Sequence, residues 1–540
     1  MKNIALILAI SAAASAAAQD LSTEVLVDRT VVPAERGASR LGGLSPQLVL
    51  PPVTPLSLTP VDYTGLSAIT RSYPRLGPAE GALAAEKSPY RGYAGIGYFP
   101  TLNIGASAGY RFVDNERMSL GASLQFDGES FKPVKDVDTK QQSWAGRLGV
   151  GFGYKVNDAS TISASVAYEY LSQSTLTWQS TGTSAGRINL GWRSRAGIVD
   201  YSVGASLGFE SNGDAKPALI GSTIEGMTLD GLGQQQYKVD AQASAAFMEN
   251  SRAGLALEAD FVHTSGLAAD AEATLGTVGV MPFYQLSTGN LTARVGVKVD
   301  FAAGGEGSVS VAPEINLQWD AAELASVWAR ATGGEVMNPF SAVRQLCQYQ
   351  IFTTAFGRSR IPVKVEAGLN VGPFSGFTAG IYGGYASAKE WLMLDSRYIQ
   401  PFAARDISGW HAGVRMGYEH RYFDVSASAE AAPSAYDRRW VDFADGAKYI
   451  VNAAATVHPI DRLDIEVGYE LRSHRAAFSA PDVKTDLGNV SDLRAGAAFR
   501  VTPAFTVFAR AENLLGHRHL QFPLVYSQKQ TGLVGVSVKF

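Results

Sequence analysis

Cysteine is almost absent from this sequence of 540 residues, in which Cys347 is the only one. A single cysteine excludes a disulfide framework and a cysteine-based metal site within one chain. Charge is also scarce, since charged residues make up 18% of the chain and the formal net charge is -4. Because the chain also lacks a long basic run, this composition argues against nucleic acid as a partner.

Long apolar runs are missing as well. Past the N-terminus, no uninterrupted apolar stretch approaches the ~20 residues that a transmembrane helix needs. The N-terminus has Lys2, then an apolar run, then three alanines before Gln19. This layout predicts a secretory signal peptide over residues 1–18, so we expect the protein to leave the cytoplasm. If it sits in a membrane it does so as a β-barrel, because only helices and closed barrels satisfy the backbone in lipid.

Residues 19–88 differ from the rest of the chain because prolines are scattered through them and strand alternation is nearly absent. Proline cannot donate to a β-ladder, so this segment is expected to be extended. Two interpretations stay open. The segment is either a periplasmic tail or linker, or a stretch that lines or obstructs the lumen of a barrel.

From residue 89 onward the sequence alternates with period two, which is the period of a β-strand. In the last stretch Val534, Val536, Val538 and Phe540 share one face, and small or polar residues share the other. About twenty-two such segments follow one another, an even number that suits bacterial outer-membrane barrels. The sequence therefore predicts an all-β fold, a large antiparallel transmembrane β-barrel over residues 89–540.

The connections between these segments are alternately short and long. Large outer-membrane barrels have this pattern because their periplasmic turns are short and their extracellular loops are longer. Two connections that should be long, near Pro100 and Gly304, are short exceptions. The alternation supports the barrel and predicts which connections face the outside.

The most specific pattern lies in the last 36 residues or so. A strand runs into Glu512, Asn513 and Leu514, a loop follows, and a glycine-led strand ends the chain at Phe540. This resembles the end of the barrel of TonB-dependent receptors. The resemblance implies a twenty-two-stranded barrel in the outer membrane of a Gram-negative bacterium, surrounded by lipid. It also implies that the terminal strand is recognised by the barrel-assembly machinery.

The resemblance does not extend to the N-terminus. TonB-dependent receptors carry a folded plug that is much longer than the 70 residues from Gln19 to Ser88 (88 minus 18). The stretch from Thr23 to Val27 resembles a TonB box only faintly. The resemblance therefore implies a plug-less member, for which TonB-driven import is not expected.

A barrel of this size encloses a lumen too wide for wall side chains to fill, so something must occlude it. The candidates are residues 19–88, the unusually apolar loop from Gly334 to Ile361, and a partner protein. For the loop, the sequence leaves open whether it blocks the lumen or packs on itself as an extracellular hairpin. Charged residues that should face the lumen and set its selectivity are Arg111, Arg147, Lys238, Asp240, Arg294, Lys298, Lys364, Glu366 and Arg415.

Motifs for catalysis, cofactors and metals are weak. His517 and His519 lack a third ligand, and the acidic residues near Asp138 lack the spacing of an EF-hand. The sequence therefore predicts no enzyme, no cofactor and no metal site. Two functions remain: a passive or gated transport pore, and a non-conducting structural or assembly subunit that binds an outer-membrane or periplasmic protein.

Overall fold

The computed structural model describes residues 90–540, except residues 101, 136, 180, 220–221, 224–227, 268–273, 306, 347–348, 350–351, 396–401 and 524. The expected signal peptide and the proline-rich segment 19–88 lie outside the described residues. Among the described residues, no helix combines the length and apolarity needed to cross a membrane.

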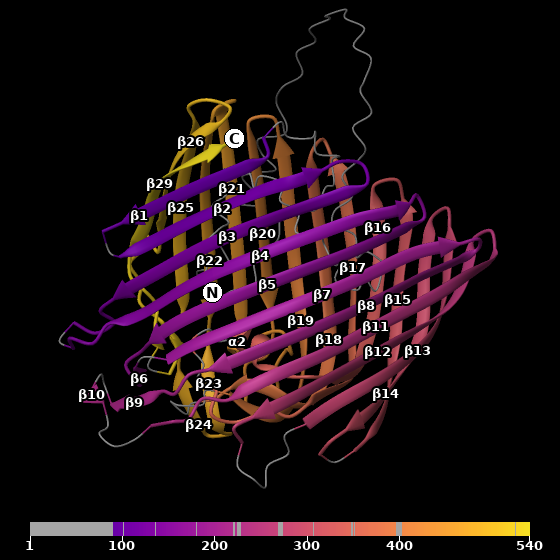
Figure 1. Cartoon of the computed structure of the whole chain (residues 1–540), viewed down its shortest axis with the longest axis horizontal. Helices are drawn as coiled ribbons and strands as arrows, with labels where there is room; N and C mark the ends of the chain where they lie inside the picture. The colour runs from indigo at the N-terminus through magenta and orange to yellow at the C-terminus, as the bar shows by residue number, and fades with distance from the viewer. Residues whose placement is uncertain are drawn as a thin grey trace, which may run out of the picture. The chain divides into compact units, whose positions relative to one another are not determined.

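Twenty-two long strands form one antiparallel sheet that closes into a barrel, as the sequence predicts (Figure 1). The wall strands are β1 (Gly92–Phe99), β2 (Asn103–Asp114), β3 (Met118–Phe131), β4 (Gln141–Asn157), β5 (Ser160–Ser174), β7 (Thr181–Ala196), β8 (Val199–Asn212), β11 (Gly233–Met248), β12 (Ser251–Ser265), β13 (Thr274–Thr288), β14 (Leu291–Ala303), β15 (Val309–Ala322), β16 (Ala325–Val336), β17 (Ser359–Phe374), β18 (Phe377–Leu394), β19 (Phe402–His420), β20 (Phe423–Ala431), β21 (Tyr449–Ile460), β22 (Leu463–Ser473), β25 (Val490–Arg500), β26 (Phe505–Glu512) and β29 (Thr531–Lys539). Each strand pairs with the next, and β29 pairs with β1. The last pairing closes the ring and leaves no free sheet edge.

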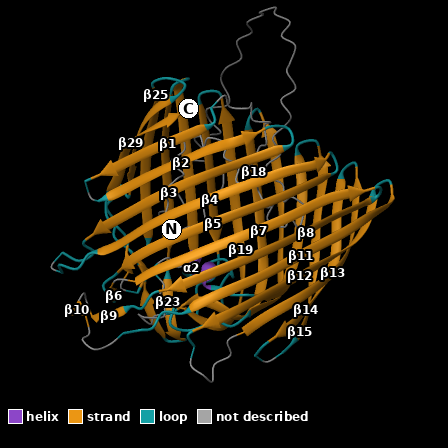
Figure 2. Cartoon of the chain, in the orientation of Figure 1, coloured by secondary structure: helices purple, strands orange, loops and turns teal. Residues whose placement is uncertain are grey.

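Short strands and a short helix lie in the connections at one end of the barrel. They are β6 (Trp178–Gln179), β9 (Lys216–Leu219), β10 (Ser222–Thr223), α2 (Phe340–Leu346), β23 (Ala476–Ala480), β24 (Val483–Asp486), β27 (Leu520–Phe522) and β28 (Val525–Tyr526). In Figure 2 the helix α2 lies near the end where β6, β9 and β23 are labelled. We call this the loop end.

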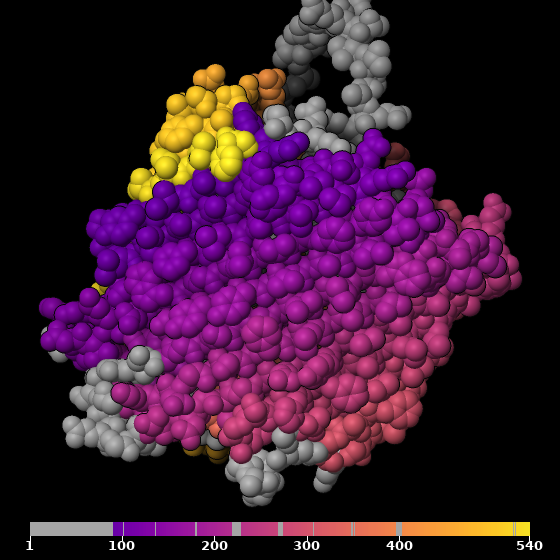
Figure 3. All heavy atoms as spheres, in the orientation of Figure 1, coloured from indigo at the N-terminus to yellow at the C-terminus, as the bar shows by residue number. Residues whose placement is uncertain are grey.

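The alternation of the sequence places apolar side chains outside the barrel. On β29, Val534 is 54% exposed and Val538 is 39% exposed, whereas Leu533 and Ser537 on the opposite face are buried. Strand side chains alternate between faces, so the same rule applies around the ring. The space-filling view shows the near wall as a continuous surface of packed strands (Figure 3). This apolar outer belt suits contact with lipid.

The two ends of the barrel differ as the sequence predicts. The chain ends at Phe540 on the turn end, where the backbone N–H of Gly92 donates to its carbonyl at 2.7 Å. Connections at this end are short, and those at the loop end are mostly long. The two exceptions near Pro100 and Gly304 are short in the structure too, which confirms the count of twenty-two strands.

Several strand boundaries at the loop end differ from the sequence-based expectation. We expect strands over 377–387 and 409–419, but β18 continues to Leu394 and β19 begins at Phe402. The register shifts between Ala388 and Trp391, which breaks the period-two alternation. The apolar loop expected over 334–361 is likewise shorter, at 337–358, because β16 and β17 extend into it.

Candidate functional site

The connection between β16 and β17, residues 337–358, contains α2 and folds into an apolar core at the loop end. We call this connection the crossing loop. Phe340, Val343 and Phe352 are 1% exposed or less, and the Phe340 and Phe352 rings stack with centroids 4.3 Å apart. Neighbouring connections contribute to the same core. Its members from other connections and strand ends include Trp178, Ala215, Leu232, Leu394, Phe402, Ala477, Leu487 and Val525.

Polar contacts tie the crossing loop to distant parts of the wall. The backbone N–H of Phe340 donates to Gln234 Oε1 on β11 at 2.6 Å, and Arg344 forms an ion pair with Glu210 on β8. The Tyr349 hydroxyl donates to the buried carboxylate of Glu129 on β3.

These contacts show that the loop crosses the lumen. It leaves the wall at β16, the thirteenth strand of the ring, and reaches β3, the third strand, ten positions away among twenty-two. Ten positions is almost half of the ring, so β3 lies nearly opposite β16. The loop is therefore not a hairpin packed only on itself, because it spans the loop end from β16 to β3. That it obstructs the lumen stays a prediction. Cys347 and Ile351 of this loop lie outside the described residues.

A second connection, residues 432–448 between β20 and β21, also folds inward but stays on its own side. We call it the cladding loop. Its Trp440 stacks on His411 of β19 with ring centroids 3.9 Å apart, and its Asp442 accepts from Lys364 Nζ of β17 at 2.7 Å. Trp391 of β18 donates to the carbonyl of Val441 at 2.9 Å. The cladding loop thus covers the inner surface of β17 to β19.

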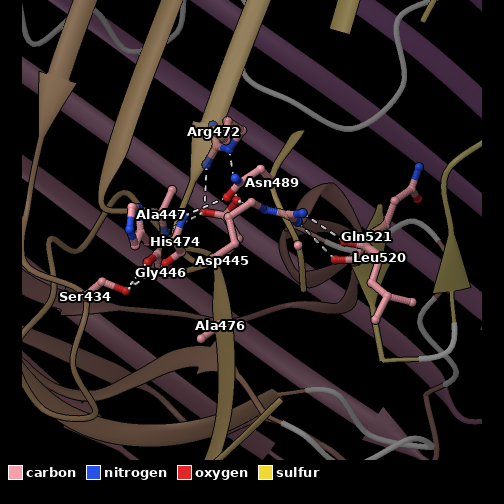
Figure 4. Close-up of polar contacts among 12 residues, drawn as sticks. Ser434, Asp445, Gly446, Ala447, Arg472, His474, Ala476, Asn489, Leu520 and Gln521 are labelled. Carbon is pink, nitrogen blue, oxygen red and sulfur yellow. Dashed lines mark hydrogen bonds and ion pairs between the residues drawn. The ribbon is translucent and has the colours of Figure 1, made fainter. Parts of the chain in front are cut away.

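Asp445 joins the cladding loop to two neighbouring connections (Figure 4). It accepts from Arg472 at 2.7 and 2.9 Å and from Arg475 at 2.8 Å. Arg475 in turn donates to the carbonyl of Leu520 at 2.9 Å. Burial opposes charge on Asp445, but the attraction of Arg472 and Arg475 is stronger, so its pKa lies well below the usual range. A charged carboxylate therefore holds three connections together.

His519 lies in the connection that Arg475 reaches. Burial and the nearby positive charge of Arg475 lower the pKa of His519 to about 3. The imidazole is therefore neutral at ordinary pH. His517 is exposed, and no group of three or more potential ligands that could hold a metal ion occurs among the described residues.

The charges predicted for the lumen lie on the wall face opposite the exposed apolar side chains, and most have partners on the same strand or on strands one or two positions away. Lys238 and Lys298 are brought together by Glu258, at 2.6 and 3.3 Å. Arg147 bridges two further carboxylates, Asp127 at 2.6 Å and Glu169 at 2.9 Å. Glu258 was not among the charges predicted to set the selectivity of the lumen, and its bridging role depends on strand register.

The remaining predicted charges form separate contacts. Arg111 pairs with Asp114 at 2.6 Å, and Lys364 lies 3.8 Å from Glu366. The guanidinium of Arg294 lies 3.8 Å from the centroid of the Phe283 ring. Arg415 donates to the side-chain oxygen of Asn370 at 2.7 Å. The carboxylate of Asp240 lies beside Gly204, so a Cβ added to Gly204 would collide with it. That these groups set selectivity stays a prediction.

The turn that resembles TonB-dependent receptors has a structural role at the loop end. Asn513 adopts a positive φ of 48° and ends β26. Its side-chain amide donates to the carbonyls of His517 at 2.7 Å and Gln528 at 2.9 Å. Glu512 pairs with Arg510 at 3.1 Å, and Leu514 is exposed. The amide of Asn513 thus fixes both sides of the last connection.

Comparison with known proteins supports the fold. A family model described as a protein of unknown function, DUF481, matches residues 86–194, and no curated protein matches the chain. The chain is similar in structure to the FrpB iron transporter (F3-3 variant) of Neisseria meningitidis, with a TM-score of 0.64 and 10% identity over 85% of this chain and 82% of that one.

Two receptors have the same likeness. The siderophore receptor PirA of Acinetobacter baumannii has a TM-score of 0.62 at 8% identity, covering 83% of this chain and 80% of its own. The ferripyoverdine receptor of the outer membrane of Pseudomonas aeruginosa has a TM-score of 0.62 at 10% identity, covering 84% and 72%. At this identity the likeness concerns the fold. This chain has the closed, twenty-two-stranded outer-membrane barrel fold of TonB-dependent receptors.

Proposed function

We propose that this protein is a gated transport pore of the Gram-negative outer membrane, closed at its extracellular mouth by the crossing loop. The observation that carries the proposal is the contact of residues 337–358 with β3, nearly opposite the strands that anchor the loop. A barrel of this strand number encloses a wide lumen, and an uncovered lumen would leak.

The contacts of the crossing loop suit an element with two positions. Its apolar side chains pack among other connections, while its links to the far wall are a few polar contacts. Breaking such contacts costs a few kcal/mol, which a ligand or a movement of the neighbouring loops can supply. The paired charges on the wall provide a polar surface along which a hydrated solute can move.

The proline-rich segment 19–88 is a second element that could obstruct the lumen, as the sequence suggests. It lies outside the described residues, and its deletion is therefore one arm of the conductance experiment. The absence of a plug and the independence from TonB remain parts of this proposal.

Single-channel conductance in planar bilayers tests the pore. We expect the full-length barrel to conduct in brief openings, and we expect larger or longer openings when residues 19–88 are deleted if that segment also obstructs the lumen. Silence of the full-length protein, of the 19–88 deletion and of a crossing-loop deletion would contradict the pore. Purification from the native membrane with a stoichiometric partner would then favour the structural or assembly role.

A further inference from the structure

A cavity of about 510 Å³ lies between α2 and the wall strands β4, β5, β7, β8 and β11. Polar side chains line it from two sides. The wall contributes Arg187, Glu210 and Gln234, and the crossing loop contributes Ser341, Arg344 and Gln345. Its volume lies within the range of small-molecule sites.

Arg187 differs from the other two arginines of the cavity. Arg147 pairs with Asp127 and Glu169, and Arg344 pairs with Glu210. Arg187 has no carboxylate within ion-pair distance among the described residues, and its contact is with the Ser341 hydroxyl at 3.4 Å. The side chain of Arg187 is exposed. An accessible guanidinium with donors left for a ligand is suited to bidentate binding of a carboxylate or phosphate.

Gly208 leaves space beside this guanidinium. It lies on β8 between Arg187 and Gln236, which are its partners in register on the two neighbouring strands. A Cβ added to Gly208 would make only ordinary contacts, 3.7 Å from Gln236 Cβ and 3.9 Å from Arg187 Nε. A larger side chain here would extend into the cavity without displacing backbone.

We propose that this cavity binds a small, hydroxyl-rich molecule that carries one carboxylate or phosphate group, with Arg187 as the anion-binding residue. Ser341 and Gln345 supply hydroxyl and amide groups that match ligand hydroxyls. The arginine-paired carboxylates of Glu169 and Glu210 can accept hydrogen bonds from ligand hydroxyls but repel a second anionic group. The biological meaning of this site rests on the proposed pore, because a solute would reach it through the lumen mouth.

Equilibrium binding to the full-length barrel in detergent tests the site without requiring conductance. The probes are D-glucuronate and D-glucose 6-phosphate, with D-glucose as the uncharged match. We expect both anions to bind and glucose to bind at least about ten-fold more weakly, because a charge-assisted pair is lost. The anion with the lower dissociation constant shows whether the site prefers a carboxylate or a phosphate.

Two substitutions and one control variant assign binding to the cavity. R187Q should weaken both anions at least about ten-fold, whereas R193Q, on the same face of β7 six residues away, should leave binding unchanged. G208L should abolish binding by filling the space. Heat-dependent mobility on gels establishes that each variant is a folded barrel before its binding is measured.

The outcomes separate this inference from the proposed function. Glucose binding as tight as that of the anions, unchanged binding in R187Q, or no binding of either anion overturns the site. A barrel that never conducts but binds glucuronate through Arg187 overturns the pore and keeps the site. A barrel that conducts but fails the binding test overturns the site and keeps the pore.

Discussion

The crossing loop and the cladding loop both fold inward but reach different walls. The crossing loop leaves at β16 and bonds to β11, β8 and β3. The cladding loop leaves at β20 and packs on β17, β18 and β19, close to its own origin. A loop that spans the lumen changes the opening when it moves, whereas a loop that covers its own wall changes mainly the stability of that wall.

Their polar contacts also differ in kind. The crossing loop has single contacts spread over several strands. Besides its single ion pair between Asp442 and Lys364, the cladding loop has a cluster at Asp445, where two arginines meet one buried carboxylate. Spread contacts can break one at a time, but a buried ion triad is lost or kept as a unit. The crossing loop is therefore the better candidate for a gate, and the cladding loop for a brace.

The largest expected effect comes from deleting each loop. Replacing residues 338–357 with a short Gly-Ser linker should raise single-channel conductance several-fold, because the obstruction is removed. Replacing residues 435–445 should instead lower the thermal unfolding temperature and leave conductance nearly unchanged. If the second deletion opens the pore as far as the first, the contrast between the loops is wrong.

The ion triad provides the next test. Asp445→Asn should destabilise the loop end by about 3–5 kcal/mol, because it leaves Arg472 and Arg475 buried without a countercharge. Thermal unfolding in detergent measures the loss. Asp437→Asn in the same loop is the control, because Asp437 is exposed, and it should have almost no effect. Equal effects of the two substitutions would show that the triad does not brace the loops.

Acid should lower the stability of the loop end through His519, which lies in the connection that Arg475 contacts. Its pKa is about 3 in the folded protein, against an ordinary histidine value of 6.5, so the unfolded chain binds more protons between these two pH values. Stability contributed by neutral His519 is complete above pH 6.5 and falls as the pH drops toward 3, by at most about 1.4 kcal/mol per pH unit. His519→Gln should flatten this part of the stability curve.

The control for this prediction is His517→Gln, two residues away and exposed. It should leave the pH dependence of the unfolding temperature unchanged. A His519→Gln variant that keeps the full acid sensitivity between pH 6.5 and 3 would assign the effect to other groups.

The smallest expected effect concerns one contact of the crossing loop. Tyr349→Phe removes the hydroxyl that donates to Glu129 and keeps the ring in the apolar core. A hydrogen bond to a charged group is worth about 1.5–3 kcal/mol, so the ratio of open to closed states should rise roughly ten-fold or more. Tyr436→Phe in the cladding loop is the matched control and should not change open probability in bilayer recordings.

The wall of this barrel was largely predictable from sequence. Period-two alternation identified all twenty-two strands, because a strand residue takes the inner or outer face by its position alone. The parity of Lys238 and Glu258 places both on the inner face, and the tight turn between their strands brings them close. Where β18 and β19 extend beyond the expected ends, a register shift at Ala388 breaks that parity.

The loop end was not predictable in the same way. The crossing loop is recognisable by its apolar residues, but its partners Gln234 and Glu129 lie 106 and 220 residues away in sequence. Asp445 carries no local signal of its two arginines, and Arg187 resembles any other charge on the inner face. Alternation gives no information about these contacts, because irregular segments have no fixed face.

The sequence by itself determined the membrane-spanning sheet, its strand number and which side chains face lipid, because these depend on local alternation and on the requirement that every backbone group be paired in lipid. Only the tertiary structure decided that one loop crosses the lumen while another covers its own wall. Those contacts depend on where each strand lies around the closed ring, and that position exists only once β29 has paired with β1.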